Sequence, residues 1–220
     1  MGTGYMAQLQ SLPEPLRSQM LNGDFAAGME DDPWQVIPTA WVELAMNRWT
    51  PKSPKGRMSS MGVDVARGGK DNTVISRRHD MWFDELLAYP GKETPSGQAA
   101  AAMVISQWRD RAPIHIDVIG VGASPYDFLR EMAPQVLGVN VAEKALSHDK
   151  SGRLSFSNQR SELWWKLREL LDPENDSGIA LPPDSRLLSD LCAPLWRLQG
   201  SIIQVESREQ IIERIGRSPD

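Results

Sequence analysis

The middle of the chain alternates between apolar and polar positions in short runs that end at turns. This pattern predicts three strands, at Met58–Ala66, Thr73–Arg78 and Trp82–Tyr89. Gly68 and Gly69 suit the turn between the first two. Because the connections are too short for a crossover helix, consecutive strands are predicted to pair antiparallel as a meander.

After the meander the apolar positions take a helical period, and strands then alternate with helices. Helices are predicted from Pro95 to about Arg111 and at Tyr126–Met132, and strands at Ile114–Ile119 and Val136–Ala142. A meander followed by this alternation gives a mixed central sheet with flanking helices, in the element order of the ribonuclease H fold. The predicted class is therefore α/β, ribonuclease H-like, preceded by an irregular N-terminal extension.

The last third of the chain begins with a long polar loop, Glu143–Ser157, whose lack of apolar periodicity predicts mobility. Capping residues then mark the ends of helices. The predicted elements are a helix from Asn158 to Leu171, a helix from Asp184 to Cys192, a hairpin of Leu195–Leu198 with Ile202–Glu206, and a helix at Arg208–Ile215 between Ser207 and Gly216.

Residues 1–50 have little periodicity and several prolines, and they are predicted to be an extension or linker. Their clearest element is a helix at Ala40–Asn47 with Thr39 as its N-cap. The polar, proline-containing segment Thr50–Gly56 follows, and the predicted domain boundary lies there. Residues 51–220 are then the globular domain.

Composition and charge narrow the possible functions. The 220 residues include one cysteine, Cys192, which excludes internal disulfides, fits a reducing cytosol and is predicted to be a small core residue. The sequence has no run of about 18 apolar residues, so neither a transmembrane helix nor a membrane partner is expected. The net charge of −5 argues mildly against a protein covered by nucleic acid, although it leaves room for local basic patches.

Two aspartates interrupt apolar strands and suggest a metal site. Asp64 lies in the first predicted strand and Asp117 in the fourth, where a carboxylate is costly to bury unless a cation accompanies it. The two strands are neighbours in this topology, about 4.8 Å apart, so the carboxylates repel each other unless cations lie between them. Oxygen ligands favour Mg²⁺ or Mn²⁺, and two such ions are typical of phosphodiester cleavage. The alternative for each aspartate is a solvent-facing side chain, or one paired with a nearby basic residue.

A third acid is needed to complete such a site, and the sequence offers four candidates. Asp127 and Glu162 lie on predicted amphipathic helices and are interpreted as solvated positions. Asp190 is also on a predicted helix and is interpreted as a surface residue. Asp220 ends the sequence in Ser-Pro-Asp, which is a suitable start for another helix.

Glycines and basic side chains could bring a phosphate to this site. Gly120 and Gly122 would let a backbone approach closely, at a point where the phosphate of a ligand could pass. Basic residues, most of them on the predicted loop, could contact phosphates, with ordinary solvation as the alternative. The candidate DNA-binding residues are Lys70, Lys144, His148, Lys150 and Arg153.

Several segments together resemble the C-terminal nuclease domain of the large terminase subunit of tailed bacteriophages. They are Gly62–Asp71, Ile116–Gly122, Asn158–Trp164 and Val205–Asp220, and in addition Leu21–Met29 and Trp34–Pro38 resemble the segment that joins that family's ATPase to its nuclease. The resemblance spans essentially the whole chain. It implies a metal-dependent endonuclease that cuts concatemeric double-stranded viral DNA at the start and end of genome packaging.

The resemblance also implies site residues, partners and a location. Asp64 and Asp117 match the first two metal-binding acids of the family, and Asp220 is the choice for the third, with Asp190 in reserve. The implied partners are the portal protein, the small terminase subunit and the ATPase domain of the same polypeptide, in the cytoplasm of the infected bacterial host. No Gly-x-x-x-x-Gly-Lys-Ser/Thr motif occurs in the sequence, so ATP hydrolysis by it is not expected.

Two other functions fit the same residues. A non-catalytic module could dock DNA or a portal ring while another domain performs the chemistry, and the net charge of −5 favours this alternative. Another ribonuclease H-like enzyme, such as a resolvase or a transposase, is the third hypothesis. The linker-like N-terminal segment argues against that third hypothesis.

Overall fold

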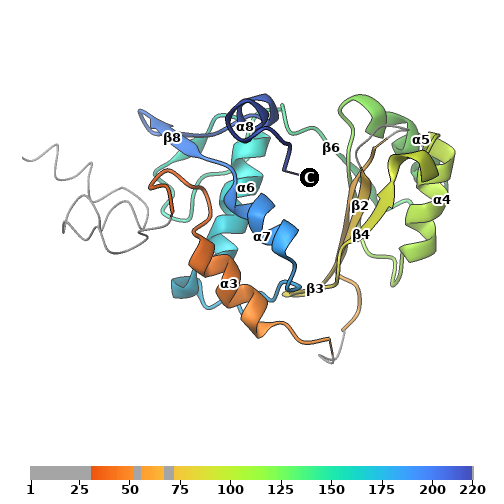
Figure 1. Cartoon of the computed structure of the whole chain (residues 1–220). Coiled ribbons are helices and arrows are strands. Elements are labelled where there is room, and N and C mark those ends of the chain that lie inside the picture. Colours follow the sequence, from red (N-terminus) through yellow and green to blue (C-terminus); the bar gives the residue numbers. More distant parts are fainter. Residues whose placement is uncertain (1–30, 52–55, 67–71, 220) are drawn as a thin grey trace, which may run out of the picture.

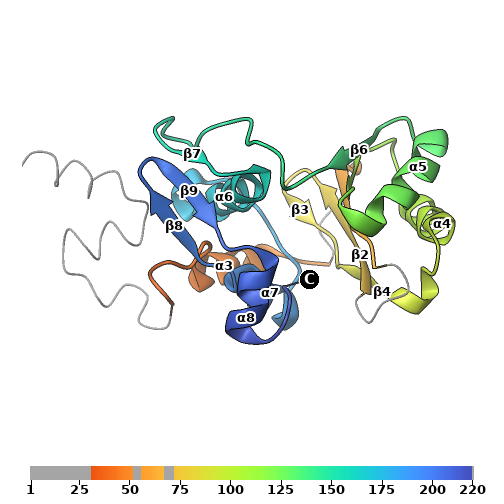
Figure 2. The same ribbon diagram turned by 90° about the horizontal axis from the view of Figure 1, so that it is seen from above.

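The structure, a computed structural model, describes residues 31–51, 56–66 and 72–219. These residues form two lobes, and each lobe has its own hydrophobic core (Figures 1 and 2). The first lobe holds the central sheet, and the second holds a small sheet packed among helices. No helix in the described ranges is long and apolar enough to cross a membrane.

The central sheet of the first lobe is mixed, as predicted. Its strand order is β3-β2-β1-β5-β6, and β4 also pairs with β2. β1 pairs antiparallel with β2 and parallel with β5, which pairs parallel with β6. The strands are β1 (Ser60–Asp64), β2 (Asn72–His79), β3 (Trp82–Phe83), β4 (Leu87–Pro90), β5 (Ile114–Asp117) and β6 (Val136–Val139).

Helices α4 (Gly97–Gln107) and α5 (Ala123–Met132) pack together and cover one face of this sheet (Figures 1 and 2). The side chains of Val63 and Ile116 point into the core beneath them and are buried. Because neighbouring residues of a strand point to opposite faces, the residues that follow Val63 and Ile116 lie on the other face. That second face is turned toward the second lobe.

The predicted third strand, Trp82–Tyr89, is divided into β3 and β4. The division lies at Asp84, whose buried carboxylate pairs with Arg77 of β2 at 3.1 Å and whose N–H donates to the Arg77 carbonyl. Both short strands still pair antiparallel with β2, so the meander is confirmed and only the continuity of its last strand is wrong.

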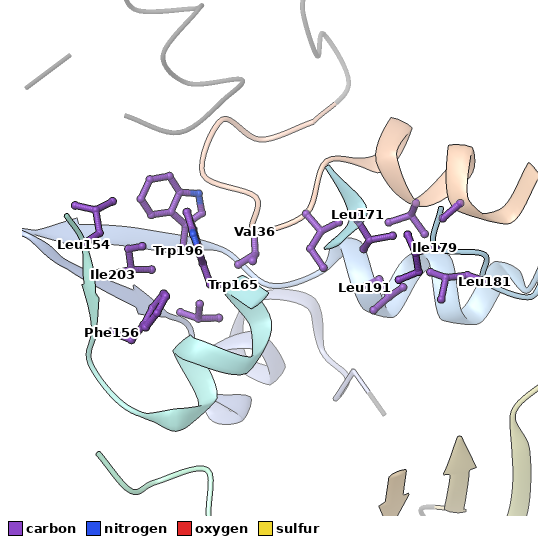
Figure 3. Close-up of a cluster of buried hydrophobic side chains, with 14 residues drawn as sticks. Val36, Leu154, Phe156, Trp165, Leu171, Ile179, Leu181, Leu191, Trp196 and Ile203 are labelled. Atoms are coloured by element: carbon purple, nitrogen blue, oxygen red, sulfur yellow. The ribbon is translucent and has the colours of Figure 1, made fainter. Parts of the chain in front are cut away.

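The second lobe is built around a small sheet of order β7-β9-β8. Its core joins strand and helix residues, and Figure 3 shows Trp165 and Trp196 at one end of it. These two rings meet edge to face with their centroids 4.9 Å apart. The elements are α3 (Thr39–Arg48), β7 (Ser155–Phe156), α6 (Gln159–Leu171), α7 (Ser185–Cys192), β8 (Trp196–Gln199), β9 (Ile202–Val205) and α8 (Arg208–Ile215), with short 3-10 turns at Gly91–Glu93, Gly120–Gly122 and Pro173–Asn175.

Most of the predicted helix ends are confirmed. The Asn158 side chain accepts from the Ser161 N–H at the start of α6, and Ser207 forms a capping box with Gln210 at the start of α8. Gly216 ends α8 in the left-handed conformation. The N-cap predicted for α3 is wrong. Helix α3 begins at Thr39 itself, and the Thr39 N–H and hydroxyl donate to the carboxylate of Asp31, eight residues earlier.

Residues 31–49 contribute to the core of the second lobe. Val36, Ile37, Val42 and Ala45 are fully buried in the same cluster as Trp165. The predicted boundary near residue 50 stays a prediction, but this part of the segment is integral to the packing of the lobe. Residues 1–30 lie outside the described ranges.

The predicted mobile loop, Glu143–Ser157, is tied down along its length. Asp149 accepts hydrogen bonds from the N–H groups of Arg153 and Leu154, at 3.0 and 2.8 Å. Leu154 is buried in the core, and the loop ends in strand β7, which pairs with β9. The segment is therefore held by contacts with distant residues that its own sequence pattern does not reveal, and its mobility stays a prediction.

Candidate metal centre on the central sheet

Asp64 and Asp117 lie side by side on the two central parallel strands. Val63 of β1 is in register with Ile116 of β5, so the next residues, Asp64 and Asp117, end the two strands opposite each other. Adjacent strands lie about 4.8 Å apart, and residues in register point to the same face. The two carboxylates therefore share the face turned away from α4 and α5.

The two carboxylates are more accessible than the sequence predicts. Asp64 is exposed and Asp117 is half-buried, because they point away from the packed face of the sheet. The prediction that the two carboxylates are buried within apolar strands, at a cost in free energy, is therefore wrong. Their proximity on neighbouring strands, and not burial, favours a cation between them, since two like charges this close repel each other.

The Asp117 side chain is held by the backbone that follows it. Its Oδ1 accepts a hydrogen bond of 2.8 Å from the Ile119 N–H. Among the described residues no donor contacts Oδ2, so this oxygen is available to a ligand. An oriented carboxylate on an accessible face, beside a second carboxylate, suits the oxygen-rich coordination of Mg²⁺ or Mn²⁺.

Gly122 is needed because the chain folds back against Asp117. A Cβ at Gly122 would lie 1.7 Å from the Asp117 carbonyl oxygen. The close approach predicted for this glycine therefore occurs, but its partner is the protein backbone and not a ligand. Gly120 differs, because it has a positive φ of +68° and a Cβ there would meet no described atom within 4 Å.

Gly122→Ala is expected to lower stability by about 1–3 kcal/mol, because a methyl group cannot fit against the Asp117 carbonyl unless the backbone moves. The same movement displaces Asp117, so metal affinity should fall as well. Gly120→Ala is the matched control, with a cost of about 1 kcal/mol for the left-handed conformation alone. Urea unfolding and metal titration of both variants measure this, and equal losses would contradict the close packing.

The residues offered as a third acid are placed differently. Asp220 lies outside the described residues. The last described residues, Arg217–Pro219, run from α8 into the region between the lobes, toward the face of the sheet that carries the two aspartates (Figures 1 and 2). Asp127 is exposed on α5, as predicted. In the described part of the chain, no group of three His, Cys, Asp or Glu residues is arranged to hold a metal.

Asp190 is buried in the second lobe, so its interpretation as a surface residue is wrong. Its carboxylate forms an ion pair with Arg217 and a longer one, of 3.7 Å, with Arg186. Ser189 accepts a hydrogen bond from the same Arg217 guanidinium. In this arrangement Asp190 fixes the segment that follows α8.

Glu162 also has a structural role where solvation is predicted. Its carboxylate accepts from the Leu146 N–H at 2.7 Å and from the Ser147 hydroxyl at 2.6 Å, and so it anchors the loop before α6.

Cys192 packs against the core of the second lobe, and burial raises the pKa of its thiol. A raised pKa disfavours the nucleophilic thiolate, in agreement with the predicted core role.

The basic residues predicted to contact DNA are in the second lobe or outside the described ranges. Lys70 is outside them. The side chains of the other four are exposed on the loop that leads to α6. That they bind DNA stays a prediction. These four residues are Lys144, His148, Lys150 and Arg153.

Polar residues on the same sheet face as the aspartates were not singled out from the sequence. Ser60 precedes Asp64 by four residues on β1, and His115 precedes Asp117 by two on β5, so both share the face of the aspartates. Arg78 of β2 is in register with Ser60. The alternation of side chains along the strands is the signal that could have identified them.

No protein-family model matches the sequence, and no curated protein matches it. Solved structures do match. The nuclease domain of the large terminase subunit gp2 of bacterial virus Sf6 is 15% identical, with 84% of this chain and 93% of that chain covered, and a TM-score of 0.65. A mutant of that domain with manganese and beta-thujaplicinol is 16% identical, with 84% and 94% covered and a TM-score of 0.64.

The chain has the fold of these nuclease domains. The α/β, ribonuclease H-like class predicted from the order of elements is thereby confirmed, and so is the resemblance in fold to terminase nuclease domains. The alignment includes 84% of the chain, which is more than either lobe contains, so the agreement in fold extends to both lobes.

Proposed function

We propose that this chain is a metal-dependent endonuclease that cuts concatemeric double-stranded DNA during viral genome packaging. One observation carries the proposal, the placement of Asp64 and Asp117 in register at the ends of adjacent parallel strands. The fold shared with terminase nuclease domains supports it, and one of those domains was solved with manganese.

In this proposal Asp64 and Asp117 hold two Mg²⁺ or Mn²⁺ ions. Asp64, on the central strand, would be one ligand, and Asp117 would offer the oxygen that the Ile119 N–H leaves open. Asp220 is proposed as the third ligand. When bound, such a pair of ions supplies the activation of water and the stabilisation of the leaving oxygen in phosphodiester hydrolysis.

The protein's own contribution is to fix the carboxylates before metal and DNA arrive. The hydrogen bond from Ile119 orients Asp117, and the close packing of Gly122 fixes the backbone below it. The ion pair of Asp190 with Arg217 holds the chain just ahead of Asp220. These contacts limit the rearrangement that coordination requires, which favours tight binding.

By resemblance, the proposed partners are the portal protein, the small terminase subunit and the ATPase domain of the same polypeptide, in the cytoplasm of the infected bacterial host. The competing function is a non-catalytic module that docks DNA or a portal ring. It predicts binding without cleavage, so one assay separates the two.

The chain is expected to nick and linearise supercoiled plasmid in the presence of Mn²⁺ or Mg²⁺, and to lose this activity completely in excess EDTA. The reason is that two adjacent carboxylates cannot hydrolyse a phosphodiester without cations to neutralise them. Gel electrophoresis of the plasmid over time measures it. Retention of DNA in a gel shift without any cleavage at millimolar Mn²⁺ would support the docking module instead.

A further inference from the structure

A cavity of about 400 Å³ opens at the other end of the strands that carry the aspartates. Ser60, Arg78 and His115 line it, together with Asp80 and neighbouring residues. Ser60 and His115 occupy the same face as Asp64 and Asp117. At about 3.3 Å per residue, Ser60 lies about 13 Å from Asp64, and His115 lies about 7 Å from Asp117.

Two of the side chains that line this cavity, Ser60 and His115, have hydrogen-bonding groups that the protein leaves unused. Among the described residues, the Ser60 hydroxyl and both ring nitrogens of His115 are without a hydrogen-bond partner. Several unpaired donors around one cavity are suited to an anion with several acceptor oxygens.

Arg78 brings the positive charge and is held in position from three sides. Its Nε donates to the Asp80 carbonyl at 2.5 Å, one terminal nitrogen contacts the Met81 sulfur at 3.5 Å, and its guanidinium lies 5.6 Å from the centre of the Phe83 ring. The second terminal nitrogen, Nη1, has no hydrogen-bond partner within the described residues. A fixed guanidinium with a remaining donor is suited to a phosphate oxygen.

Asp80 sets a limit on how strongly such a cavity attracts anions. Asp80 lines the same cavity, and its negative charge offsets that of Arg78. A free phosphate ion is therefore expected to bind weakly. A phosphate that belongs to a DNA strand already bound at the two aspartates arrives at high effective concentration, and a single well-oriented contact is then enough.

We propose that this cavity binds a phosphodiester group of the DNA strand that is cut, several nucleotides from the cleavage position. The inference rests on the proposed nuclease function. The span from Asp64 to Ser60, about 13 Å, corresponds to about four steps of 3.4 Å along a duplex. The cavity would thus fix the direction in which the strand crosses the sheet.

The test compares Arg78→Gln with a matched control, Arg130→Gln. Arg130 is exposed on α5, on the far side of the sheet, and its loss changes the net charge by the same amount. Both are made in an Asp64→Asn, Asp117→Asn background, so that binding of a short duplex is measured without cleavage. Fluorescence anisotropy is recorded at several salt concentrations.

Arg78→Gln is expected to weaken DNA binding about 3–10-fold and to reduce the slope of log K against log[salt] by about 0.9, the value for one phosphate contact. Arg130→Gln should leave the slope unchanged. Equal slopes for Arg78→Gln and its parent would overturn the inference. Fold integrity is checked by thermal unfolding. If Arg78→Gln is unfolded, His115→Ala is tested instead, in the protein that keeps Asp64 and Asp117. We expect this variant to raise the KM for DNA cleavage and to leave kcat unchanged. An unchanged KM would contradict the proposed phosphate-binding cavity.

The experiments distinguish a wrong phosphate-binding proposal from a wrong nuclease proposal. If the unmodified chain cuts plasmid with Mn²⁺ but Arg78→Gln keeps the parental salt dependence, only the cavity is wrong. If the unmodified chain neither cuts nor binds DNA, the nuclease proposal fails, and the phosphate site is overturned with it.

Discussion

Asp64→Asn and Asp117→Asn are each expected to reduce DNA cleavage by about 1,000-fold or more while leaving the fold intact. An asparagine amide offers one neutral oxygen where the carboxylate offers two charged ones, so it cannot bridge two cations. Loss of a single group that stabilises transition-state charge already costs enzymes about 100- to 1,000-fold. Removal of a metal-binding carboxylate should be at least as severe.

The fold should tolerate both substitutions because neither side chain supports a core. Asp64 is exposed, and Asp117 is half-buried at the end of its strand. Replacing one of two neighbouring like charges removes repulsion in the metal-free protein, which favours the folded state slightly. The free energy of unfolding without metal should therefore stay within about 0.5 kcal/mol of that of the parent.

Plasmid nicking with Mn²⁺ measures the activity, and calorimetric titration measures metal binding. Asp127→Asn is the matched control, since Asp127 is an exposed aspartate on α5. It should retain parental cleavage and metal affinity. Nicking at the parental rate by either Asp64→Asn or Asp117→Asn would show that these residues are not the metal centre.

The position of the two aspartates could be predicted from the sequence because it depends on local signals. Periodicity located the strands, and short connections required an antiparallel meander. The element order of the ribonuclease H fold then placed the first strand in the centre, beside the fourth. The following helix and strand then brought Asp117 next to Asp64. Their exposure was missed because periodicity did not reveal that, within the described ranges, no helix of the first lobe covers this face of the sheet.

Features that depend on distant partners could not be predicted in the same way. Strand β7 consists of only two residues, and its partner β9 lies more than forty residues further along the chain. Asp190 has the sequence environment of a surface helix, yet it is buried and pairs with Arg217, which returns to it from beyond α8. Asp84 interrupts a predicted strand for a similar reason, its pairing with Arg77.

Of the features that the sequence did not reveal, the burial of the N-terminal segment has the largest expected effect on stability. Its prolines and weak periodicity suggested a linker, yet Val36 and its neighbours are fully buried. Arg168 of α6 joins the two parts. Its guanidinium lies 4.7 Å from the centre of the Trp41 ring and 5.0 Å from that of Trp165, and it donates to the Val36 carbonyl.

Arg168→Ala is expected to destabilise the protein by about 3–5 kcal/mol. The substitution removes two cation–π contacts, each worth about 1–2 kcal/mol when desolvated, and leaves the Val36 carbonyl without this donor inside the core. It also leaves a cavity between the rings of Trp41 and Trp165. Arg168→Lys should recover little of the loss, because an ammonium group cannot stack on two rings as a planar guanidinium does.

Lys166→Ala is the matched control on the same helix. Lys166 is partly exposed, pairs with Glu169 at 3.0 Å and donates to the His148 carbonyl at 2.7 Å, so its loss should cost about 1 kcal/mol. Urea unfolding followed by tryptophan fluorescence compares the variants. If Arg168→Ala cost as little as Lys166→Ala, residues 31–49 would be a peripheral extension after all. A loss of several kcal/mol would instead support a core that residues 31–49 share with α6.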